Sequence, residues 1–242
     1  MVLTGIFIIG RQQDRPPVVK KQATKPAQII EPEPASFDKQ QYSLIDPSSI
    51  WLVVNKLRPL EPNGYTPTNL VVPNIALRAN ITSNEKYLRA DVASALAVMD
   101  TAAKADGVTF NLQSGYRSYG FQTVLYNSYV KQQGQAQADT ESARPGYSEH
   151  QTGMAADLGS TTNSSCNIAR CYADTIEGKW LAANAYKYGF IIRYAQDKQP
   201  ITGYTFEPWH VRYIGPELSK EMQSKKALTL EEFFGLPAAP SY

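Results

Sequence analysis

The positions of the two histidines, the only ones in this chain, restrict its fold more than any other feature. His150 lies in the segment Ser-Glu-His-Gln-Thr-Gly-Met-Ala-Ala-Asp at 148–157, and His210 ends the segment Glu-Pro-Trp-His at 207–210. Two neutral imidazoles and the carboxylate of Asp157 make a three-ligand zinc set, which leaves one coordination position for water. Because His210 follows Asp157 by 53 residues, such a site needs a fold that joins two distant segments.

A further carboxylate gives this pattern a catalytic interpretation. Glu207 lies three residues before His210, where it could take a proton from a metal-activated water. A structural zinc site is more often closed by four protein ligands, commonly cysteines. Taken singly, a histidine is more often a structural residue, and Asp157 could be a turn residue. Their coincidence in two short segments favours a hydrolytic zinc site with one Zn²⁺.

Other residues are candidates for holding the substrate. His150 and Asp157 can face one point if the chain turns near Gly153 and enters a strand over 155–158. Arg117 lies at a predicted strand-to-helix turn, where it could stabilise the oxyanion formed by attack on an amide, although single arginines are usually solvated surface residues. Gln122 and Ser148 are further candidates for substrate binding.

The pattern of apolar residues predicts an α+β fold with helices packed on a small antiparallel sheet. The clearest helix is 84–105, capped by Ser83, with Leu88, Val92, Leu96, Met99 and Ala103 on its buried face. A second helix, 119–133, places Phe121, Leu125 and Tyr129 on its inner face, and a third covers 179–188. Strands are expected over 50–54, 108–112, 155–158, 190–194, 203–206 and 210–213.

Composition divides the chain into three parts. Residues 1–10 form a short apolar segment, well below the ~20 residues that span a bilayer. It lacks the basic flank and cleavage site of a signal peptide, so it is either a membrane-anchor remnant or a frayed tail. The Pro- and Lys-rich residues 11–35 predict a disordered linker, and residues 36–242 a catalytic domain. The net charge of +2 gives no indication of nucleic-acid binding.

The cysteine pair bears on the compartment. Cys166 and Cys171 are the only cysteines, and a small loop-closing disulfide is the favoured interpretation. A disulfide would indicate an oxidising, extracytoplasmic setting. A pair of free thiols is the alternative.

Three motifs in order resemble the VanY-type zinc D,D-carboxypeptidases, a family that includes L,D-carboxypeptidases of the bacterial cell wall. They are Ser-Gly-Tyr-Arg-Ser at 114–118, Ser-x-His-x-x-Gly-x-Ala-x-Asp at 148–157 and Glu-x-x-His at 207–210, within a likeness covering about 48–236. The resemblance implies a Hedgehog/D,D-peptidase-like fold and zinc on His150, Asp157 and His210. It also implies Glu207 as the base and Arg117 as the residue that binds the substrate carbonyl.

The function expected from the motifs and the resemblance is removal of the terminal D-alanine from peptidoglycan stem peptides, at the cell surface. An endopeptidase or a D-Ala-D-Ala dipeptidase on the same scaffold is an alternative, and a non-catalytic zinc-containing cell-wall or signalling module is another. A binding module needs neither a base nor an oxyanion donor, so Glu207 and Arg117 favour the enzyme. We expect a monomer, tethered to the membrane if residues 1–10 are an anchor remnant. The motifs do not distinguish pentapeptide from tetrapeptide substrates.

Overall fold

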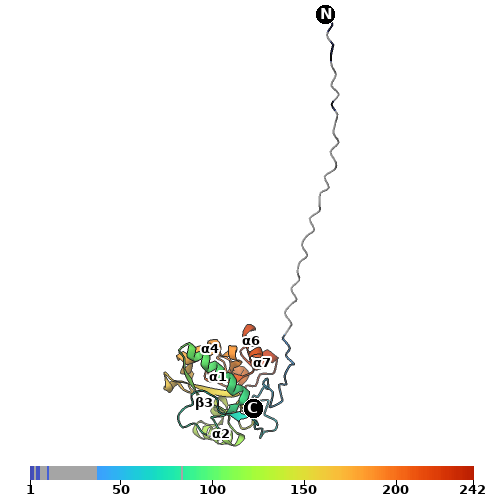
Figure 1. Ribbon diagram of the computed structural model, residues 1–242. Coiled ribbons are helices and arrows are strands. Elements are labelled where there is room, and N and C mark those ends of the chain that lie inside the picture. The colour runs from blue at the N-terminus through green and yellow to red at the C-terminus, as the bar shows by residue number, and fades with distance from the viewer. Residues whose placement is uncertain (3, 6–9, 11–36, 83) are drawn as a thin grey trace. The chain divides into compact units, whose positions relative to one another are not determined.

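The computed structural model describes residues 1, 2, 4, 5, 10, 37–82 and 84–242 (Figure 1). The chain divides into two units, Met1–Ser36 and Phe37–Tyr242. The predicted linker and the Ser83 cap lie outside the described residues, and the apolar segment is described only in part. None of the helices in the described part of the chain has both the length and the apolar character needed to cross a membrane.

A four-stranded antiparallel sheet forms the centre of the unit Phe37–Tyr242. Its strands are β3 (Phe110–Ser114), β4 (Ala155–Ser160), β6 (His210–Tyr213) and β5 (Phe190–Ile192), in that spatial order. A separate pair joins β1 (Leu70–Val71) to β2 (Leu88–Arg89). The predicted α+β class with a small antiparallel sheet is confirmed.

The helices are mostly short. The α-helices are α1 (Ala90–Ala105), α2 (Tyr119–Gln133), α3 (Gln135–Glu141), α4 (Ile176–Asn184), α5 (Gln199–Thr202), α6 (Pro216–Ser224) and α7 (Leu230–Phe234). Four 3₁₀ turns are η1 (Glu149–Thr152), η2 (Ser164–Cys166), η3 (Arg170–Asp174) and η4 (Ala185–Tyr188). In Figure 1 α1 and α4 lie together, and α2 lies apart from them.

The two faces of the sheet have different roles, because side chains alternate along a strand. On one face Ala156, Leu158 and Val211 pack with residues of α1 and α4 in the main apolar core. Register pairs Ala156 with Val211 and Asp157 with His210. Asp157 and His210 therefore lie side by side on the opposite face.

A second apolar cluster lies beside the first and includes the segment predicted as a strand over 50–54. Trp51 and Val53 pack there with α6 and α7. The segment is buried, as expected, but it is not a strand in the structure. Arginine side chains bond to its carbonyl groups in place of the backbone hydrogen bonds of a neighbouring strand. The guanidinium of Arg212 donates to Leu52 O at 2.8 Å, and that of Arg58 donates to Val53 O at 3.3 Å.

The helix predicted over 84–105 begins later than expected. Leu88 and Arg89 pair with β1 instead, so α1 starts at Ala90. The predicted apolar face of this segment is buried throughout, and Gly107, with φ of 75°, follows the helix as expected.

Two further predictions were wrong. In α2 the buried residues are Gln122 and Tyr126, whereas Phe121 is only partly buried and Leu125 and Tyr129 line a cleft. The segment 203–206 is not a strand, because Gly203 has φ of 81° and Thr205 N bonds to Thr140 O beside α3. Cys166 and Cys171 are joined by a disulfide, which closes a short loop after β4.

Candidate metal centre and active site

The 3₁₀ turn η1 and strand β4 together place His150 and Asp157. Gly153 ends η1 in the left-handed region with φ of 68°, and the chain then enters β4. A side chain there would be strained, and its Cβ would lie 3.1 Å from Arg89 N, which donates to Gly153 O. The predicted turn at Gly153 followed by a strand is confirmed.

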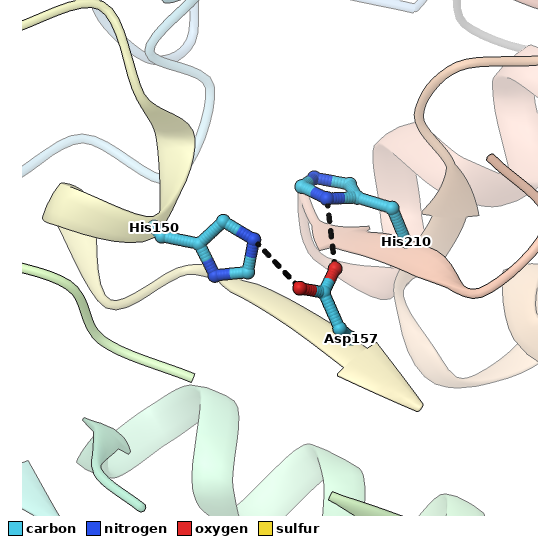
Figure 2. Close-up of side chains that lie close together, drawn as sticks. All are labelled: His150, Asp157 and His210. Carbon is cyan, nitrogen blue, oxygen red and sulfur yellow. Dashed lines mark ion pairs between the residues drawn. The ribbon is translucent and has the colours of Figure 1, made fainter. Parts of the chain in front are cut away.

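Three predicted ligand residues converge from η1, β4 and β6, as Figure 2 shows. His150 Nε2 lies 3.3 Å from Asp157 Oδ2, and His210 Nδ1 lies 3.1 Å from Asp157 Oδ1. One ligand atom from each residue lies within 4.8 Å of the others. All three side chains are buried, with exposed fractions of at most 4%.

The chemistry of this cluster fits a divalent cation. The Nδ1 of His150 lies 2.6 Å from Gly115 O, so it carries the proton and leaves the Nε2 lone pair facing Asp157. Asp157 Oδ1 is buried and has no hydrogen-bond donor among the described residues. A buried carboxylate oxygen of this kind is normally satisfied, and a metal ion would satisfy it. Two imidazole nitrogens and one carboxylate oxygen are ligands that zinc prefers.

Glu207 lies at the edge of this cluster. Its Oε2 is 3.7 Å from His210 Nδ1, and the residue is 8% exposed. Burial raises the pKa of Glu207 to about 8, against the opposing effects of His210 and Arg117. Burial lowers the pKa of His210, but the neighbouring carboxylates of Asp157 and Glu149 outweigh it and raise that pKa to about 9. A proton and a cation therefore compete for this imidazole.

Arg117 contacts the cluster from the turn before α2. Its Nη2 donates to Asp157 Oδ2 at 2.5 Å, and its Nε donates to Ser114 Oγ at 2.9 Å. These two bonds hold the guanidinium at the wall of the cleft. Burial alone would raise the pKa of Asp157, but His150 and Arg117 hold it well below its usual range. The carboxylate is consequently ionised and ready to bind a cation.

The remaining predicted residues line the same cleft of about 660 Å³, which contains the three ligands, Glu207 and Arg117. Ser148 is buried and lines this cleft. The Gln122 side chain is also buried, and its Nε2 donates to Ala143 O at 2.7 Å. The Oε1 of Gln122, by contrast, lacks a hydrogen-bond partner among the described residues, and Gln122 lines the cleft, so this amide can offer an acceptor there.

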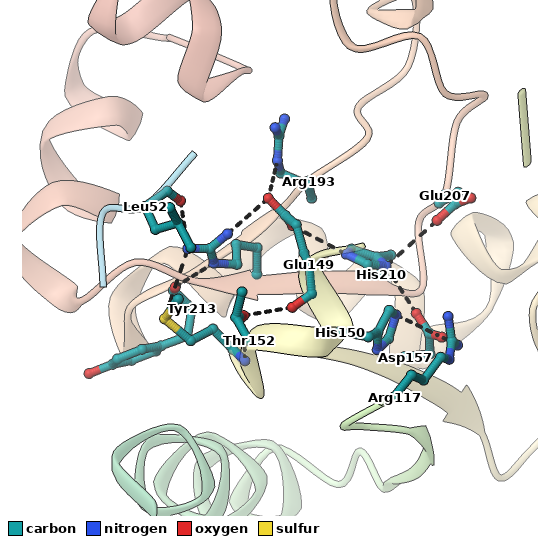
Figure 3. A network of polar contacts seen from close by, with 12 residues as sticks. Leu52, Arg117, Glu149, His150, Thr152, Asp157, Arg193, Glu207, His210 and Tyr213 are labelled. Atoms are coloured by element: carbon teal, nitrogen blue, oxygen red, sulfur yellow. Dashed lines mark hydrogen bonds and ion pairs between the residues drawn. The ribbon is translucent and has the colours of Figure 1, made fainter. Parts of the chain in front are cut away.

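Sequence reasoning missed a group of buried charges behind the ligands. Glu149 forms ion pairs with Arg193 and Arg212. Figure 3 shows Glu149 between Arg193 and His210. The only available signal for Glu149 was its place next to His150. No sequence pattern connected it with arginines 44 and 63 residues away.

The chain resembles known proteins across most of the domain. It is 42% identical over 189 residues to a Bacillus subtilis (strain 168) protein named provisionally as carboxypeptidase YodJ; the match covers 78% of this chain and 68% of that protein. The solved structure of the LdcB LD-carboxypeptidase, which reveals the molecular basis of peptidoglycan recognition, matches with a TM-score of 0.73 at 42% identity. That match covers 78% of this chain and 87% of LdcB.

A second solved structure carries a metal. It is a mutant of the vancomycin-resistance D,D-pentapeptidase VanY from the VanB-type cassette, in complex with Zn(II). It matches with a TM-score of 0.62 at 31% identity and covers 76% of this chain and 98% of that one. Residues 85–216, which include every candidate site residue, match the VanY family described as D-alanyl-D-alanine carboxypeptidase. The chain therefore belongs to the VanY family of D-alanyl-D-alanine carboxypeptidases.

Proposed function

We propose that this protein is a zinc carboxypeptidase that removes the C-terminal D-alanine from peptidoglycan stem peptides. The observation that carries the proposal is the convergence of His150, Asp157 and His210 in a cleft that also contains Glu207 and Arg117. Support for the substrate class comes from the family and from LdcB, an LD-carboxypeptidase of peptidoglycan. Such a substrate lies outside the cytoplasmic membrane, where a disulfide is stable.

His150, Asp157 and His210 would hold one Zn²⁺, the ion present in the VanY relative. Zinc bound there would lower the pKa of a water and polarise the scissile carbonyl. Glu207 takes the proton from the attacking water and returns it to the leaving amine, a role that typically contributes about 10²–10⁴-fold. Zinc bound nearby would favour the ionised form that accepts the proton, whereas burial, which raises the pKa of Glu207, favours the protonated form that passes it on.

Arg117 would donate to the substrate carbonyl oxygen as negative charge develops on it. The bonds from Arg117 to Ser114 and Asp157 restrict the guanidinium to one orientation, which lowers the entropic cost of that contact. Ser148 and the Oε1 of Gln122 would bind polar groups of the peptide deeper in the cleft.

The test uses defined muropeptides with tripeptide, tetrapeptide and pentapeptide stems, separated by chromatography and identified by mass. We expect release of one D-alanine from tetrapeptide or pentapeptide stems, its loss with a chelator, and its recovery with zinc. Glu207→Gln is the matched variant and should bind zinc without releasing D-alanine. Zinc binding with no release from any stem would contradict the proposal and favour a non-catalytic module.

The products also separate the two enzymatic alternatives. An endopeptidase would convert cross-linked dimers to monomers, and a dipeptidase would split free D-Ala-D-Ala. We expect the carboxypeptidase reaction to be the fastest of the three.

A further inference from the structure

Four charged side chains form a closed cluster beneath the candidate metal centre, and the proposed reaction uses none of them. Glu149, Arg193, Arg212 and Glu231 are each at most 1% exposed. Arg193 Nε and Arg212 Nη1 donate to Glu149 Oε1 at 2.8 and 2.9 Å. Arg193 also donates to both oxygens of Glu231. Burying four charges is costly even when they are paired, so a role beyond stability is worth testing.

The two oxygens of Glu149 face different partners. Oε1 accepts hydrogen bonds from Arg193 and Arg212, whereas Oε2 lies 3.5 Å from His210 Nε2. Both of these facing atoms are buried and have no other hydrogen-bond partner in the described part of the chain. Each guanidinium nitrogen of Arg193 and Arg212 already donates to Glu149 Oε1, to Glu231 or to a backbone oxygen, which leaves Oε2 facing His210.

The imidazole of His210 has one nitrogen on each side. Nδ1 faces Asp157, and Nε2 faces Glu149 (Figure 3). Nδ1 can bind a cation only with its lone pair free, which requires the proton on Nε2. A carboxylate beside Nε2 favours this tautomer and orients the ring.

The arginines in turn keep Glu149 in place. Arg212 Nη2 donates to Leu52 O at 2.8 Å, and Glu231, at the start of α7, accepts from Asn55 at 2.9 Å. Through Arg193, which follows β5, and Arg212 of β6, the cluster thus connects α7 and the loop 52–55 to one oxygen of Glu149. Neither Glu149 oxygen can move without breaking a buried ion pair.

We propose that Glu149 is a positioning residue, which accepts the Nε2 proton of His210 and so presents Nδ1 to the metal. This inference rests on the proposed function for the identity of the metal. In the same arrangement, Glu149→Gln offers only one oxygen, which the two cationic guanidiniums would take. The amide NH₂ would then face His210 Nε2 and favour the opposite tautomer, with the proton on Nδ1.

The first test compares two variants that each remove one charge from the cluster. Glu149→Gln should weaken zinc binding 10- to 100-fold, measured by competition with a chromophoric chelator. Glu231→Gln is the matched control, because Glu231 contacts Arg193 and not His210. It should lower the melting temperature while zinc affinity stays within threefold of wild type. Unchanged zinc affinity in folded Glu149→Gln, or an equal loss in both variants, would overturn the proposal.

The second test needs no variant, so it holds even if Glu149→Gln fails to fold. With only two histidines in the chain, long-range ¹H–¹⁵N correlation spectra of the zinc-loaded protein resolve both rings. We expect His210 with a protonated Nε2 and a metal-bound Nδ1. A metal-bound or unprotonated Nε2 would overturn the inference. Zinc affinity and the His210 tautomer can be measured whether or not the protein hydrolyses peptides. A failure of this inference is therefore distinguishable from a failure of the proposed activity.

Discussion

Glu177 is a buried acidic residue whose replacement should destabilise the domain. Its carboxylate closes the loop that follows β4, the strand that carries Asp157. Oε1 accepts from Thr161 N at 2.9 Å and from Thr162 N at 3.1 Å, and Oε2 accepts from the Ser160 hydroxyl at 2.9 Å. Glu177 also lies in the first turn of α4, where a negative charge is favourable.

Glu177→Ala removes the acceptor of six hydrogen bonds from Ser160, Thr161 and Thr162, three of which come from the threonine hydroxyls. A buried donor left without a partner costs about 1–3 kcal/mol. Thr161 and Thr162 are exposed residues, so water can replace part of the loss. We therefore expect Glu177→Ala to lower the free energy of unfolding by about 2–3 kcal/mol, near the lower end of the summed cost of the unpaired donors. For a domain of this size each kcal/mol lowers Tm by about 2–4 °C, which gives a loss of roughly 4–12 °C.

The pH dependence identifies the carboxylate as the cause. Burial raises the pKa of Glu177, but hydrogen bonds from its own backbone, Ser160, Thr161 and Thr162 outweigh it and lower the pKa below 4.5. The stabilisation by the Glu177 carboxylate is therefore complete above about pH 4.5 and is lost as the pH falls through the pKa of Glu177 in the folded protein. The Tm deficit of Glu177→Ala should be constant from pH 5 to 8 and shrink towards pH 3.

Thermal melts followed by circular dichroism at pH 7, 5, 4 and 3 measure this. Glu217→Ala is the matched control, because Glu217 occupies the first turn of α6 but is exposed. It should change Tm by less than 2 °C. A neutral-pH deficit below 2 °C for Glu177→Ala, or one that persists at pH 3, would refute the reasoning.

Three further variants test the candidate site. Arg117→Lys should lower kcat by about 10²–10³-fold, because lysine cannot hold both the oxyanion and its present partners, while zinc content measured by mass spectrometry stays unchanged. Replacing Cys166 and Cys171 by serine opens a loop with a separation of 5 residues, which should lower the free energy of unfolding by ~2 kcal/mol. Thermal melts measure this loss as a lower Tm. Since part of that loop lines the cleft, KM should rise more than kcat falls; unchanged KM would contradict this. Gly115→Ala should weaken zinc binding in a chelator titration, because the new Cβ would lie 2.3 Å from a backbone oxygen and displace the carbonyl that holds His150.

The sequence predicted the bounds of an element well where capping or terminating residues mark its ends. The range 119–133 matches α2 because Ser118 caps its first turn, accepting from Phe121 N, and Gly134 has φ of 82°. The segment 50–54 lacks such signals. Its apolar residues fit a strand, but arginine side chains satisfy its carbonyls, and the one that bonds to Leu52 O comes from Arg212, 160 residues away, which no local pattern reveals.

The candidate ligand residues could be chosen from the sequence because histidine is rare in this chain and each histidine lies near a carboxylate. Glu149 could not be assigned a role in the same way. Its position beside His150 gives no reason to connect it with His210, 61 residues away in sequence (210 − 149). That connection depends on β6 lying beside β4 and on two arginines from β6 and the end of β5.

The register between β4 and β6 shows how the core selects the geometry of the site. Ala156 pairs with Val211 on the core face, which places Asp157 opposite His210 on the other face. A slip by one residue would turn His210 into the apolar core and Val211 towards the cleft. The cost of burying an imidazole there, and of exposing Val211, opposes that slip. Apolar packing on one side of the sheet thus holds two candidate ligands together on the other, so enlarging Ala156 should disturb the proposed zinc binding although its side chain faces away from the site.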